Sequence, residues 1–81
     1  MKIYPFDYNV CPDNSPEGFK KACKKIEEHF PDLKKEALLV DVDGTTIQTY
    51  ADHGKEIVVF DDYDVGAVFV KSEIELNAIF G

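Results

Sequence analysis

Acidic side chains crowd the second half of this 81-residue chain, mainly in segments that are typical of turns. Carboxylates at this density support two kinds of chemistry. They can hold a hard cation through their oxygens, or they can attract the basic surface of another protein. The candidate partner-binding residues are Asp41, Asp43, Asp52, Glu56, Asp61, Asp62, Tyr63 and Asp64.

The acidic segment after residue 60 does not follow a calcium-loop pattern. Counted from Asp61, Gly66 falls at the sixth position as required, but Tyr63 occupies the third and Ser72 the twelfth, where acids are needed. His29 and His53 lie on different predicted elements, and no Cys-x-x-Cys pair is present. We therefore predict no metal site and no cofactor.

The stretch Asp41-Val42-Asp43-Gly44-Thr45, after an apolar run, resembles the first motif of the haloacid dehalogenase phosphatases. That resemblance implies Asp41 as nucleophile, Asp43 as general acid/base, and a magnesium ion. The family's motif feeds a parallel sheet, whose crossovers need about a dozen residues each. Here strand-like residues follow Gly44 at once, so a hairpin accounts for the same letters, and we predict that the protein is not an enzyme.

A basic protein is the partner that this charge pattern favours. Lysine supplies all nine basic residues against sixteen acids, for a net charge of −7, and residues 37–81 carry all of that excess. Tyr63 within the turn at 61–64 is the type of aromatic anchor found in interface hot spots. The competing interpretation is that these acids only keep a β-rich protein soluble.

Other bulk features exclude further classes. The acidic balance argues against nucleic-acid binding, and no apolar run exceeds four residues, which excludes a membrane-spanning helix and a signal-peptide core. We expect a cytoplasmic protein with Cys11 and Cys23 as free thiols. The length predicts one domain over residues 1–81.

One amphipathic helix is predicted after a loop over residues 9–16. Ser15 is a candidate N-cap, Pro16 suits the first helical position, and Pro31 ends the helix. The apolar stripe consists of Phe19, Ala22, Cys23, Ile26 and Phe30. A cluster of lysines, which we expect to be a solvated face, consists of Lys20, Lys21, Lys24 and Lys25.

Four strands are predicted over residues 37–42, 45–50, 56–60 and 67–71. Asp43-Gly44 favours a two-residue type I′ turn, which places Val42 opposite Thr45 and Val40 opposite Ile47. A second turn is expected around His53-Gly54. Residues 2–8 are typical of an edge strand or an extended arm, and the tail, 72–81, fits either a short helix or a strand.

Together these elements predict an α+β domain with one amphipathic helix packed on a four-stranded antiparallel meander. A single helix cannot cover two apolar sheet faces, so the second must meet the arm, the tail or another chain. We predict a small acidic module that neutralises a basic partner, like an immunity protein, antitoxin or nuclease inhibitor. The alternative is a non-catalytic accessory domain that forms a homodimer through its spare apolar face.

Overall fold

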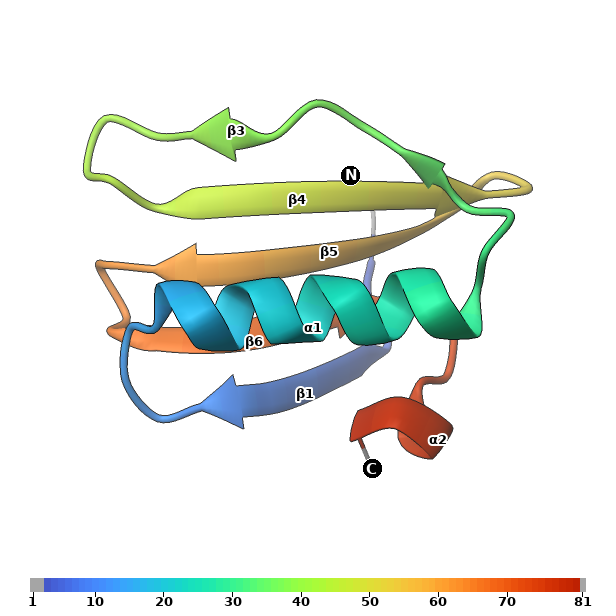
Figure 1. The fold of residues 1–81 in the computed structure, drawn as a ribbon, viewed down its shortest axis with the longest axis horizontal. Coiled ribbons are helices and arrows are strands. Elements are labelled where there is room, and N and C mark those ends of the chain that lie inside the picture. The colour runs from blue at the N-terminus through green and yellow to red at the C-terminus, as the bar shows by residue number, and fades with distance from the viewer. Residues whose placement is uncertain (1–2, 81) are drawn as a thin grey trace.

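The computed structural model describes residues 3–80, in which the long helix lies over one face of an antiparallel sheet and runs along its strands (Figure 1). The elements are β1 (Phe6–Cys11), α1 (Pro16–His29), β2 (Lys34–Lys35), β3 (Leu39–Val40), β4 (Thr46–Asp52), β5 (Lys55–Asp62), β6 (Ala67–Ser72) and α2 (Asn77–Phe80). The strand order is β1-β6-β5-β4-β2, and β3 also pairs with β4. The predicted α+β class is confirmed, but the sheet has six strands rather than four.

The helix α1 begins at the N-cap that its sequence predicts. The Ser15 hydroxyl accepts a hydrogen bond from the Gly18 amide at 2.9 Å, which caps the first turn. Its buried residues pack against the inner faces of β4, β5 and β6, and this cluster comprises Phe19, Ala22, Cys23, Ile26, Tyr50, Ile57, Val59, Val68, Val70 and Leu76. A Cβ at Gly18 would lie 2.5 Å from the Cys11 sulfur, so close packing of β1 on α1 requires glycine there.

The N-terminal segment forms a strand that extends further than predicted. β1 pairs with β6 from Phe6 to Cys11, whereas residues 9–11 were expected to belong to a loop. Pro5 precedes the strand, where its missing amide hydrogen breaks no ladder bond. A bulge between Asn9 and Cys11 keeps both Val10 and Cys11 against the core.

The predicted two-residue turn at Asp43-Gly44 is wrong. Leu39 pairs with Ile47 and Val40 with Thr46, one residue away from the expected register. The hairpin loop has three residues, closed by the Asp41 amide donating to the Thr45 carbonyl at 2.8 Å, with Gly44 at φ 91°. Glycine reaches this φ without strain and completes a bulged loop. The type I′ turn instead lies at His53-Gly54, where both φ values are positive.

The expected strand over 37–42 is also interrupted. Only Leu39–Val40 pairs with that end of β4, while Lys34–Lys35 pairs with its other end as β2. Between them the chain arches over Gln48, whose side-chain amide donates to the Glu36 carbonyl at 2.6 Å. The buried glutamine thus takes the place of a continuous ladder, and residues 34–43 are all exposed.

The first and last described segments of the chain pack on opposite faces of the sheet. Leu76 and α2 pack beside α1 and β1, where the Tyr8 hydroxyl donates to Asn77 and accepts from the Leu76 amide. Tyr4 reaches the other face, where its hydroxyl donates to Glu56 at 2.8 Å. The outer face also holds Phe60 stacked on Phe69, with ring centroids 4.8 Å apart. Within residues 3–80, neither helix is long and apolar enough to cross a membrane.

Candidate functional site

Two acidic turns, about twenty residues apart in the sequence, meet at one end of the sheet. The Tyr63 amide donates to the Thr45 hydroxyl at 3.1 Å, which joins the β5–β6 turn to the β3–β4 loop. The Tyr63 ring lies over Gly44, where an added Cβ would sit 3.6 Å from Cδ2. We call this region the acidic end, and it comprises Asp41, Asp43, Asp62, Tyr63 and Asp64.

The carboxylates of the acidic end differ in what they already bind. Asp62 accepts the amides of Asp64 and Val65, at 2.8 and 3.1 Å, and so builds its own turn. Asp43 accepts the Thr45 amide at 3.0 Å, and hydrogen bonds from Thr45 lower the pKa of this carboxyl. Asp41 and Asp64 are exposed. Asp43 therefore stays ionised to a lower pH than an isolated aspartate, which keeps the acidic end negative.

Asp61 lies beneath this end rather than on its surface. Its side chain is only 2% exposed and points to the α1 side of the sheet. One carboxylate oxygen accepts the Asn14 side-chain amide at 3.0 Å and the Ser15 amide at 3.4 Å. Asp61 thus positions the segment that starts α1, and it is not available to a partner's surface.

Asp52 and Glu56 lie at the opposite end of β4 and β5, beside the His53-Gly54 turn. Asp52 pairs with the His53 ring at 2.5 Å, and Glu56 accepts the Tyr4 hydroxyl. Strands of seven and eight residues separate them from the acidic end, a distance of roughly 20 Å at about 3.3 Å per residue. The structure therefore brings five of the eight predicted residues together and leaves Asp52, Glu56 and the buried Asp61 apart.

Apolar side chains are exposed among these carboxylates. Val42 is fully exposed, Val65 is 68% exposed and Tyr63 is 48% exposed. The two valines did not emerge from the sequence, because alternation assigned Val42 to a strand and Val65 to a turn. A prediction of the three-residue loop over residues 42–44 would have identified Val42 as exposed, since a valine in such a loop has no sheet face to pack on.

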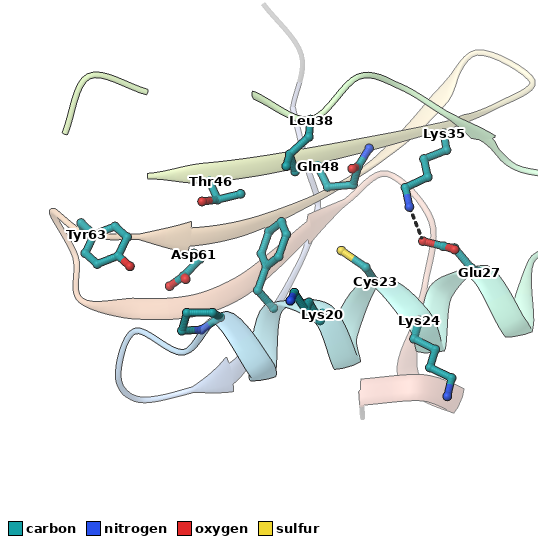
Figure 2. Close-up of a pocket in the computed structure, with 12 residues that line it drawn as sticks. Lys20, Cys23, Lys24, Glu27, Lys35, Leu38, Thr46, Gln48, Asp61 and Tyr63 are labelled. Carbon is teal, nitrogen blue, oxygen red and sulfur yellow. Dashed lines mark ion pairs between the residues drawn. The ribbon is translucent and has the colours of Figure 1, made fainter. Parts of the chain in front are cut away.

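A groove adjoins the acidic end through Tyr63, between α1 and the β3–β4 side of the sheet (Figure 2). Its volume is about 470 Å³. Apolar walls come from Phe19, Cys23, Leu38 and Tyr63, and polar groups of Thr46, Gln48 and Asp61 line its floor. The groove arises because α1 packs mainly over β5 and leaves part of β4 uncovered.

Three lysines and Glu27 border the groove on its α1 and β2 sides. Lys20 and Lys24 line it from α1, and Lys35 lines it from β2, so two members of the predicted lysine cluster border a cavity. Lys35 binds Glu27 at 3.0 Å, and the Tyr50 hydroxyl donates to Glu27 at 2.6 Å. These two hydrogen bonds lower the pKa of the Glu27 carboxyl.

Tyr50 should make the fold sensitive to alkali. Burial, followed by the hydrogen bond to Glu27, raises the pKa of the Tyr50 hydroxyl well above its ordinary 10. A tyrosine whose pKa is raised by folding stabilises the folded state fully below its unfolded pKa, about pH 10. This contribution is lost as pH rises toward the pKa of the folded state. Tyr50→Phe should therefore lose less stability than the wild type between pH 9 and 11 in urea unfolding.

Two other groups should still lower the free energy of unfolding of Tyr50→Phe as pH rises from 9 to 11. Burial raises the pKa of the Cys23 thiol and, with the Glu56 hydrogen bond, that of Tyr4 to about 12. Tyr63→Phe is the matched control for loss of a hydroxyl, because Tyr63 is 48% exposed and its substitution leaves the Tyr50–Glu27 and Tyr4–Glu56 hydrogen bonds intact. Equal slopes in the wild type and Tyr50→Phe would contradict the assignment.

Comparison with known proteins returns no matching family model, curated protein or solved structure. The site must therefore be interpreted from its own chemistry. Among residues 3–80, no three histidine, cysteine, aspartate or glutamate side chains are grouped so as to hold a metal ion. The features that bear on function are thus the acidic end, its exposed apolar side chains and the adjoining groove.

Proposed function

We propose that the protein is a small binding module that captures and neutralises a basic protein through its acidic end, in the manner of an immunity protein, antitoxin or nuclease inhibitor. The observation that supports this most is the half-exposed Tyr63, whose ring lies over Gly44 where the two turns that carry Asp41, Asp43, Asp62 and Asp64 meet. Protein interfaces combine an apolar centre with a polar rim, and charged rims raise association rates. A cytoplasmic setting remains part of the proposal, in keeping with the free thiols of Cys11 and Cys23.

The groove extends this surface beyond charge alone. A partner segment whose lysine or arginine side chains meet the acidic end can place an apolar side chain between Phe19 and Leu38. The lysines along the same groove would disfavour a uniformly basic segment, since like charges in contact weaken binding. We therefore infer a partner surface that is basic at the Tyr63 end and apolar beside it.

A second candidate function is self-assembly as a non-catalytic accessory domain. It is favoured by the outer sheet face, where Phe60 and Phe69 are only partly buried and α2 packs on the opposite face. Exposed apolar faces commonly mark interfaces. This candidate expects stable homodimers and no effect of charge changes at Asp62 or Asp64.

Affinity capture from host lysate with matched variants tests the proposal. Asp41→Lys with Asp64→Lys changes two exposed acids of the acidic end, and Glu28→Lys with Asp32→Lys makes the same charge change elsewhere on the surface. We expect the wild type and the second variant to retain one stoichiometric basic protein that elutes as salt rises. The first variant should lose it, with affinity reduced at least tenfold.

Two results would overturn the proposal. Equal loss of the captured partner in both variants would show that the net charge of the chain, rather than its acidic end, attracts the partner. Recovery of only the protein's own copies, at low and high salt, would favour the self-assembling accessory domain. If a partner is captured, it should be purified and titrated against each variant, so that the affinity change is measured without competing lysate proteins.

A further inference from the structure

The β2–β3 edge of the sheet carries a charge pattern that complements itself. Residues 34–43 read Lys-Lys-Glu-Ala-Leu-Leu-Val-Asp-Val-Asp, basic at the start, apolar in the middle and acidic at the end. All ten are exposed. Because an antiparallel pairing reverses one strand relative to the other, two copies of this segment would place each lysine end beside an aspartate end.

The backbone of β3 is also oriented for a further strand. The Asp41 amide donates inward to Thr45, and inward and outward groups alternate along an antiparallel strand. The amide and carbonyl groups of Leu38 and Val40 therefore point away from β4. In the described chain β3 pairs with β4 alone, so a neighbouring strand could bind these groups.

Natural edge strands are usually protected by charges, proline or a covering loop. β3 has none of these along Leu38, Leu39 and Val40, which are 53, 60 and 65% exposed. Leu39 shares the outer face with Ile47 and, through Ile47's pairing, with Phe60 and Phe69. Pairing two β3 edges would therefore join two such apolar rows across the new junction.

We propose that the β3 edge pairs antiparallel with the β3 edge of a second copy of this chain, forming a two-fold dimer with one continuous sheet. The apolar residues Leu38–Val40 lie at its centre. In a pairing centred on Leu39, Lys34 and Lys35 of each copy lie beside Asp43 of the other. Such a two-fold contact uses the same patch on both copies and closes at two subunits. It does not depend on a basic partner.

Sedimentation equilibrium of the purified chain over a concentration series tests the proposal. The expected species is a dimer of twice the 9.2 kDa chain mass. Val40→Pro should abolish dimerisation, because it removes an outward amide without touching the β4 ladder. Leu39→Lys should do the same by placing two lysines together at the centre.

Charge-swap variants test the pairing direction. Lys34→Glu and Asp43→Lys should each weaken the dimer about tenfold, since each substitution makes two like-charged contacts in the dimer. Mixed in equal amounts, they should form a heterodimer close to wild-type affinity. Lys25→Glu and Glu28→Lys, on the α2 side of α1, are the matched controls and should leave the dimer unchanged.

Three results would overturn the inference. One is a chain that stays monomeric throughout the series. Another is a dimer that survives Val40→Pro and Leu39→Lys, which would place the contact on another face. A third is failure of the mixed pair to recover affinity, which would exclude the antiparallel arrangement. Because no other protein is present, each result leaves the basic-partner proposal to its own test.

Discussion

Ile57→Ala is expected to lower the free energy of unfolding by about 2–5 kcal/mol. Ile57 lies on β5, the middle strand of the sheet order, is fully buried, and packs between α1 and the neighbouring strands. Truncation removes apolar contacts and leaves a cavity that rigid strands on both sides cannot close. Domains of this size have a total stability of roughly 4–12 kcal/mol, at about 0.05–0.15 kcal/mol per residue, so the loss is a large share.

Leu39→Ala is the matched control, because it shortens an aliphatic side chain of the same size in the same sheet. Leu39 is 60% exposed, so its loss should change stability by less than about 0.5 kcal/mol. Both variants should be compared by urea unfolding at a concentration where the chain is monomeric. A similar cost for the two substitutions would mean that the β3 edge is packed rather than open.

The sequence predicted those elements whose periodicity matches their burial. The apolar stripe of α1 and the runs in β5 and β6 are long enough for one period to dominate, and they form as expected. Segment 37–42 is different, because its side chains are exposed and no core selects its register. There the outcome depends on Gln48 bonding Glu36 and on Gly44 in a three-residue loop, which are contacts between segments rather than local preferences.

The candidate site was predictable as a composition but not as an arrangement. Turn propensity placed Asp43 and Asp64 correctly in loops, although Asp52, Asp61 and Asp62 belong to strand ends. Antiparallel topology alone brings alternate turns to the same end of a sheet. That argument separates Asp52 from Asp62, yet it cannot show that Asp61 turns inward while Asp62 does not. The alternation of side chains along β5 decides which way Asp61 faces, since Asp61 follows Ile57 and Val59 on the α1 face. The groove depends on where α1 sits across the sheet, which no local pattern encodes.

Asp61→Ala should lower the free energy of unfolding by about 1–3 kcal/mol, because it removes an acceptor from buried hydrogen bonds. The Asn14 side-chain amide would keep only its bond to the Asp62 carbonyl, at 2.8 Å, and the Ser15 amide would lose its acceptor on β5. Asp64→Ala, three residues away and exposed, should cost less than about 0.5 kcal/mol. Urea unfolding of both variants measures the difference.

The coupling between Asp61 and Asn14 distinguishes a specific contact from general loss of packing. If their hydrogen bond carries the effect, the double variant should lose markedly less stability than the sum of the losses in Asp61→Ala and Asn14→Ala. Additive costs, or an Asp61→Ala variant as stable as the wild type, would contradict the role assigned here. Because Asp61 joins the start of α1 to β5 directly beneath Tyr63, the same contact holds the groove wall against the acidic end. Asp61 was predicted to bind a partner because of its acidic neighbours in the sequence. In the structure it instead holds together the start of α1 and β5, the elements that adjoin the acidic end.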